Sequence, residues 1–108
     1  MITSSHKLTH VVCITAVPAN SDDARNKNTR IDSVVRALAG FAPNPLRVGQ
    51  RAYDDKKKAV RIEFGISVAS DFEAQLEAVR ILDALGPVLA NADYRPTEWS
   101  LMNPATAV

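Results

Sequence analysis

Four residues of this chain have side chains suited to holding a phosphate group or an unpaired base: Arg47, Arg51, Tyr53 and Arg61. A guanidinium group can contact phosphate oxygens, and a tyrosine ring offers a flat surface on which a base can stack. We expect all four on the outward face of one hairpin. The alternative is a solvated face, because charged side chains on an exposed strand commonly contact only water.

The charges of the chain are unevenly distributed, although the formal net charge is only +1. Between residues 45 and 61 there are six basic residues and two acidic ones, whereas between residues 70 and 100 there are two basic and six acidic ones. Such a distribution can attract a polyanion to one surface and exclude it from another. It also suits self-association.

No pattern of reactive residues indicates an enzyme. The chain lacks a Gly-rich phosphate loop, a nucleophile elbow and any His-x-Glu or Cys-x-x-Cys spacing. His6 and His10 have no third metal ligand nearby, and Cys13 stands alone in an apolar run, which predicts a buried, reduced thiol. We therefore expect no catalysis, no cofactor and no metal.

Length and composition favour a single domain over residues 1–108. A chain of 108 residues that is 46% hydrophobic supports one core. Its first residues lack the apolar segment of a signal peptide, and no window reaches the length of a membrane span. We expect a soluble, cytosolic product without a membrane partner.

The elements that must position the four residues are two strands. Residues 59–69 alternate apolar and polar side chains, which predicts a strand with one apolar face. Residues 46–53 alternate less strictly, and a polar segment over residues 54–58 connects the two runs. We predict an antiparallel hairpin 46–53/59–69. A further strand is predicted at residues 8–17, which are rich in Val, Ile and Thr.

A helix is predicted directly after the hairpin, because Ser70 and Glu73 have the spacing of a capping box. Gly86 and Pro87 should interrupt this helix, and a second short helical turn should follow over residues 88–90. The apolar stripe of the helix is expected to pack against other elements or at a dimer interface, and it consists of Phe72, Leu76, Val79, Leu82 and Leu85.

Residues 29–41 decide the architecture, and two structures remain open for them. Their apolar residues fit a helical stripe but also permit an alternating strand. A strand gives an α+β fold in which an antiparallel meander is followed by C-terminal helices. A helix, together with a last strand around Trp99, gives a ferredoxin-like βαββαβ order. That result would favour a binding or regulatory module that engages a protein, a small ligand or RNA through its sheet.

The first of these architectures resembles a known family. The strand over residues 59–67 leads into Ser70-Asp71-Phe72-Glu73, and the chain continues through residues 78–89 to Met102-Asn103-Pro104-Ala105. This order is similar to the C-terminal half of coat proteins of single-stranded RNA bacteriophages. There, a long strand gives way to a Ser-capped acidic helix, a turn with proline and an Asn-Pro-Ala-like end. The hairpin is also similar to a basic hairpin of those coats.

The resemblance implies a structural protein and no enzyme. It implies a homodimer whose sheets join edge to edge, and many dimers that close into the shell of a virion assembled in the host cytoplasm. The sheet face opposite the helices would contact genomic RNA, which gives Arg47, Arg51, Tyr53 and Arg61 an RNA-binding role. The helix stripe would then form subunit contacts.

Overall fold

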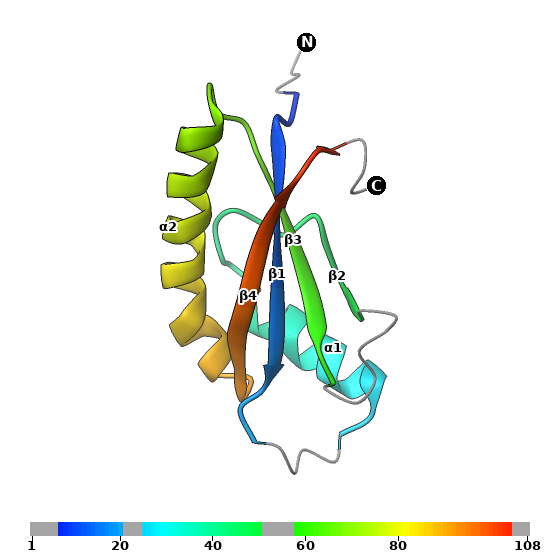
Figure 1. The fold of residues 1–108 in the computed structure, drawn as a ribbon. Helices are drawn as coiled ribbons and strands as arrows, with labels where there is room; N and C mark the ends of the chain where they lie inside the picture. The colour runs from blue at the N-terminus through cyan, green and yellow to red at the C-terminus, as the bar shows by residue number, and fades with distance from the viewer. Residues whose placement is uncertain (1–6, 21–24, 51–57, 105–108) are drawn as a thin grey trace.

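The computed structural model describes residues 7–20, 25–50 and 58–104. Within these ranges the elements are β1 (His10–Pro18), α1 (Lys27–Ala37), β2 (Arg47–Gln50), β3 (Val60–Ile66), α2 (Asp71–Ala90) and β4 (Tyr94–Met102) (Figure 1). The four described strands form one antiparallel sheet in the order β2-β3-β1-β4. The predicted α+β class is confirmed.

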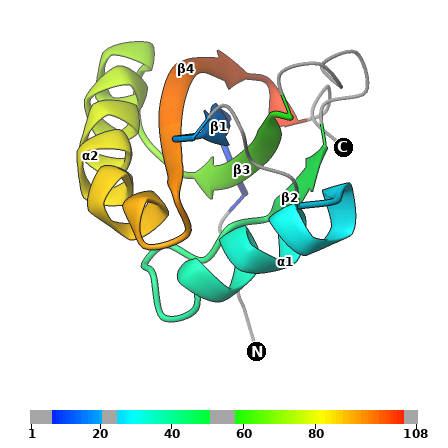
Figure 2. The same ribbon diagram turned by 90° about the horizontal axis from the view of Figure 1, so that it is seen from below.

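Both described helices cover the same face of the sheet, with α2 beside β4 and α1 beside β2 (Figure 2). Alternate strand residues point into the space beneath the helices and form the core, among them Val12, Ile14, Ile62 and Phe64. The intervening residues point to the opposite face, which no described helix covers. We call this second side the open face.

The antiparallel pairing predicted for the hairpin is confirmed by β2 and β3, which span residues 47–50 and 60–66, while residues 51–53 of the predicted hairpin lie outside the described residues. The two strands run antiparallel, with Arg47 opposite Glu63 and Gln50 opposite Val60. The alternation of apolar and polar residues over residues 59–69 explains how β3 lies in the sheet, because it gives the strand one face for the core and one for the open face.

Residues 27–37 form a helix, so the uninterrupted meander is not what the chain forms. Asn26 caps this helix, and its Oδ1 accepts the N–H of Thr29 at 2.9 Å. Val34 and Leu38, one turn apart, are buried, which shows that the helical stripe and not the alternating one faces the core. As a result α1 separates β1 from β2, and β1 pairs with β3 and β4 instead.

Helix α2 begins as predicted but does not end as predicted. Ser70 Oγ accepts the N–H of Glu73 at 3.1 Å, and Glu73 Oε2 accepts the N–H of Ala69 at 3.0 Å. The predicted interruption is wrong, because the helix continues through Pro87 to Ala90. Pro87 lacks the N–H that would donate a helical hydrogen bond to the carbonyl of Asp83, and Asp83 is an exposed residue. Burial of Leu89 holds the last turn of the helix in the core.

The face of α2 that packs on the sheet differs from the predicted stripe. The buried residues of the helix are Ala74, Ala78, Ile81, Leu85 and Leu89. Of the predicted stripe, Leu85 is buried and Leu82 is half-buried. The others are exposed, Phe72 at 69%, Leu76 at 56% and Val79 at 45%. Small alanines allow the helix to lie close to the sheet, where large strand residues already fill the core. A dimer role for the exposed part of the stripe stays a prediction.

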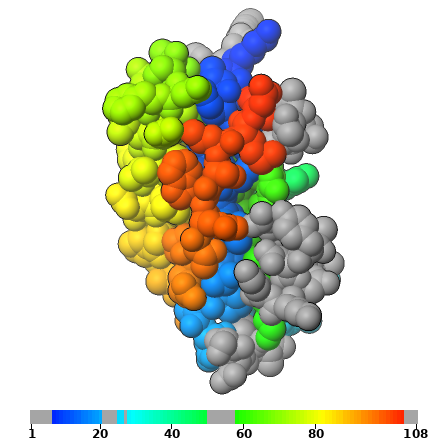
Figure 3. Space-filling view, in the orientation of Figure 1, coloured from blue at the N-terminus to red at the C-terminus, as the bar shows by residue number. Residues whose placement is uncertain are grey.

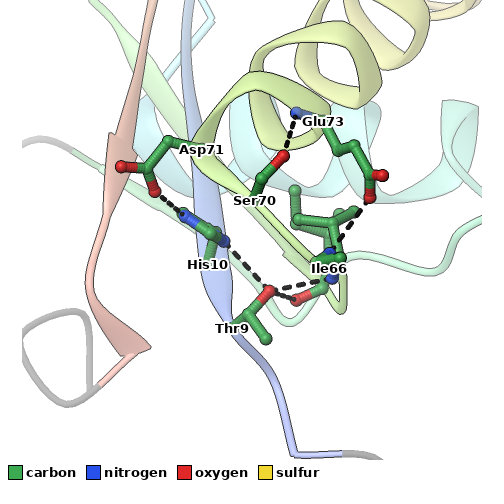
Figure 4. A network of polar contacts seen from close by, with 8 residues as sticks. Thr9, His10, Ile66, Ser70, Asp71 and Glu73 are labelled. Carbon is green, nitrogen blue, oxygen red and sulfur yellow. Dashed lines mark hydrogen bonds and ion pairs between the residues drawn. The ribbon is translucent and has the colours of Figure 1, made fainter.

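Polar contacts fix the junction where β3 leads into α2 (Figure 4). His10 Nε2 lies 2.8 Å from Asp71 Oδ1, and His10 Nδ1 lies 2.9 Å from Thr9 Oγ1. Thr9 Oγ1 also donates to the carbonyl of Ile66 at 3.3 Å and accepts the N–H of Val68 at 2.9 Å. These contacts join the start of β1 to the start of α2. In the part of the chain that the structure describes, no group of three His, Cys, Asp or Glu residues is placed to hold a metal ion.

Candidate functional site

Polar side chains from all four strands meet on the open face. The register places one row of residues across the sheet, namely Arg47, Glu63, Cys13 and Ser100. The next row on the same face contains Arg61, Thr15 and Glu98. Side chains in neighbouring rows of one face are close enough to interact, so the sheet brings together groups from distant parts of the sequence.

Glu63 is the centre of this group. Its side chain is only 4% exposed, and Oε2 lies 2.8 Å from Arg61 Nε and accepts a hydrogen bond from Arg47 Nη2 at 3.1 Å. The N–H of Arg61 Nε is not aimed at the carboxylate, so this contact is an ion pair and not a hydrogen bond. Two guanidinium groups compensate the buried carboxylate, which would cost several kcal/mol if it were unpaired.

Arg61 has hydrogen-bonding capacity beyond its contact with Glu63. Its side chain is 26% exposed, and Nη2 donates to Met102 Sδ at 3.0 Å and to Cys13 Sγ at 3.3 Å. Thioether and thiol sulfurs are weak acceptors. An oxygen ligand that approached this guanidinium would therefore replace a weak contact with a stronger one.

Cys13 is a buried free thiol, as predicted, and it donates to Met102 Sδ at 3.1 Å. Burial raises the pKa of the Cys13 thiol, and the Arg61 guanidinium opposes that shift only in part. The thiol is consequently protonated at neutral pH. It is neither an activated nucleophile nor a ready metal ligand, because both roles need the thiolate.

A cavity of about 170 Å³ opens beside Arg61, and its lining residues are Cys13, Thr15, Arg61, Glu98, Trp99 and Ser100. It combines a cation on β3 with an anion on β4, and Thr15 lies between the two in the register. A cavity of about 150 Å³ holds a ligand the size of benzene. The cavity on the open face therefore suits a ligand of a few heavy atoms.

The structure accounts for part of the predicted phosphate-binding set. Arg47 and Arg61 lie on the open face, but both contact the same carboxylate of Glu63. Arg51 and Tyr53 lie outside the described residues. The prediction missed Glu63 and Glu98. The alternation of residues 59–69 already places Glu63 on the face of Arg61, whereas Glu98 could be found only from the pairing of β1 with β4.

Two wider hollows, of about 460 and 370 Å³, lie near the C-terminal end of α2 and share Arg25. Arg25 Nη2 donates to the carbonyl of Ala92 at 3.3 Å, and its guanidinium carbon lies 5.6 Å from the centre of the Tyr94 ring. Arg25 Nη1 donates to Ser33 Oγ at 3.3 Å. These contacts hold α1 against the segment that follows α2, so they give Arg25 a structural role.

The chain matches no protein-family model, no curated protein and no solved structure. Fold and site therefore define the class of protein, which is an α+β domain with an open antiparallel sheet and a small polar cavity on the open face, as far as the described residues show. Among the described residues, neither helix is long and apolar enough to cross a membrane.

Proposed function

We propose that this protein is a ferredoxin-like binding module that holds a small zwitterionic ligand on the open face of its sheet. The element order βαββαβ and the strand order β2-β3-β1-β4 support this plan. The helix at Lys27–Ala37 and the last strand at Tyr94–Met102 favour it over a meander followed by helices. Because such a fold serves many functions, the ligand is argued from the cavity.

The charges around the cavity support a ligand that is neutral overall. Arg47 and Arg61 are balanced by Glu63 and Glu98, so these four described residues carry no net charge, and the further positive charge of Arg95 lies nearer one end of the open face, opposite Val17. RNA binding gains from an excess of basic groups that neutralise phosphates. Separated charges of opposite sign instead suit a molecule that carries both a carboxylate and a protonated amine.

The main observation in support of a zwitterionic ligand is that Arg61 and Glu98 line the same cavity. A ligand carboxylate would accept charge-assisted hydrogen bonds from the Arg61 guanidinium, and a ligand ammonium would lie against Glu98. The hydroxyl groups of Thr15 and Ser100 line the cavity as well and offer further polar contacts. In this arrangement Glu63 is a positioning residue, since its carboxylate holds the guanidinium of Arg61 in place.

Calorimetric titration with glycine as the probe tests this function, with acetate and methylammonium as probes that carry one charge each. We expect saturable binding of glycine that is tighter than that of either half-probe. Arg61→Gln and Glu98→Gln should each weaken glycine binding by about tenfold or more, which corresponds to about 1.4 kcal/mol.

The control is Arg36→Gln, which changes an exposed arginine of α1 away from the open face and should leave binding unchanged. Glu98→Gln keeps the test interpretable even if Arg61→Gln misfolds. Glu98 is exposed, and its substitution leaves the ion pairs of Glu63 intact. Equal glycine binding by the wild type and by both site variants would contradict the proposal, as would the absence of saturable binding to the wild type.

A second candidate function is a shell-forming coat subunit of a small RNA phage. The exposed apolar residues of α2 and the outer strands β2 and β4 favour it, because both offer surfaces for self-association. This function requires large particles that contain RNA. Negative-stain microscopy and sedimentation velocity of the purified chain separate the candidates: particles support the coat, and species no larger than a dimer support the module.

A further inference from the structure

We infer that this protein forms a two-fold symmetric homodimer through the outward face of α2. The contact is the outer stripe, defined as Phe72, Leu76 and Val79, which are the three large exposed apolar residues among those described for this helix. Figure 3 shows α2 running along one side of the molecule without another described element over it.

The outer stripe points away from the core of its own chain. Its residues are four and three positions apart, which is the spacing of a seam between two helices. The buried residues Ala74 and Ile81 lie on the opposite side of the helix, against the sheet. A single exposed apolar residue is ordinary, but contiguous ones on one helix face form a patch that typically marks an interaction site.

The charges beside the outer stripe are complementary to those of a second copy. Glu73 and Arg80 are seven residues apart and therefore lie on the same flank of the stripe. If two α2 helices pack antiparallel with Leu76 near the two-fold axis, Phe72 of each copy lies close to Val79 of the other. The same crossing brings Glu73 of each copy close to Arg80 of the other.

In a parallel pair, Glu73 of one copy would lie beside Glu73 of the other, and Arg80 beside Arg80, so like charges would meet. The charges therefore favour the antiparallel arrangement, as do the two helix dipoles. Within one chain Arg80 is paired with Glu77 of the preceding turn, and this contact orders the guanidinium on that side of the helix. The next position of the seam is the exposed Asp83, which ends the apolar contact. A contact of two turns predicts a reversible dimer whose population depends on concentration.

Sedimentation equilibrium of the full chain over a range of concentrations tests the dimer. We expect Leu76→Asp to raise the dissociation constant of the dimer by about a hundredfold or more, and each tenfold change corresponds to about 1.4 kcal/mol. The matched control is Val35→Asp, because Val35 is an exposed valine of α1, at 47%. This control should associate as the wild type does. Far-UV circular dichroism of the diluted variants checks that each remains folded.

A charge exchange tests the antiparallel register. Glu73→Arg and Arg80→Glu should each weaken the dimer several-fold, and the double variant should recover most of the loss. A wild type that stays monomeric at every concentration would overturn the inference, and so would Leu76→Asp that associates as tightly as Val35→Asp. A double variant weaker than both single variants would overturn the antiparallel register.

Discussion

Arg61 and Glu63, two residues apart on β3, form a buried ion pair on the sheet face that no described helix covers, with Arg61 Nε 2.8 Å from Glu63 Oε2. Arg47 donates to the same oxygen from the neighbouring strand. Arg47 and Arg61, the two described arginines among those predicted to contact a polyanion, thus share an acidic partner within the fold. The pair also orients Arg61 beside the cavity that Glu98 shares.

Glu63→Gln should destabilise the protein by about 1.5–3 kcal/mol, because it removes the charged acceptor of Arg47 and the counter-charge of Arg61, whose guanidinium groups remain partly solvated. Urea unfolding measures this loss in the free energy of unfolding. Glu98→Gln, at an exposed position of the same face, should cost less than about 1 kcal/mol. Equal losses in the two variants would show that the burial of Glu63 does not matter to stability.

Leu85→Ala should cost about 2–5 kcal/mol, because the Leu85 side chain is fully buried in the core. Leu76→Ala should cost less than about 0.5 kcal/mol, since Leu76 is exposed. Unfolding is followed at low protein concentration so that association does not contribute. The reverse order of the two losses would mean that α2 presents the other face to the sheet.

Ser70→Ala should lower the free energy of unfolding by about 1 kcal/mol, because it removes the acceptor for the N–H of Glu73. Ser70→Asp should keep most of the stability, since aspartate is an equally good capping residue. Thermal unfolding of the two variants provides the measurement. If Ser70→Asp lost as much as Ser70→Ala, the cap would not be the cause.

The stability that Cys13 contributes should decrease at alkaline pH. Burial raises the thiol pKa in the folded state, so the folded chain holds this proton more tightly than the unfolded chain does. The contribution is complete below the ordinary thiol pKa of 9.0 and is lost as pH rises through the higher folded value. The stability difference between wild type and Cys13→Ala, from urea unfolding across this range, should therefore shrink as pH rises. A difference that stays constant would show that the thiol pKa is the same in both states.

Local patterns in the sequence predicted the elements with strong local causes. Strict alternation identified β3, and the Ser70 and Glu73 pair identified the start of α2. The end of that helix was missed because Gly86 and Pro87 are poor helix residues, whereas burial of Leu89 holds the turn beyond them. Residues 29–41 stayed ambiguous because both periods fit them, and packing of α1 against the sheet decided the outcome.

The candidate site was harder to predict because it depends on strand register. Arg61 and Glu63 share a face by alternation alone, but Thr15 and Glu98 join them only through the pairing of β1 with β3 and β4. The face of α2 was missed for another reason. Phe72 and Leu76 are larger than Ala74 and Ala78, and the sequence does not show whether an apolar stripe covers its own sheet or a second molecule.

The most direct test of the ligand site is a titration of the isotope-labelled protein with glycine, followed by nuclear magnetic resonance. We expect saturable shifts of the Arg61 side-chain Nε–H signal and of the backbone amides of Thr15 and Ser100, which Glu98→Gln strongly reduces. Shifts at Arg25 and the residues around it, with none at Arg61, would contradict the proposed site.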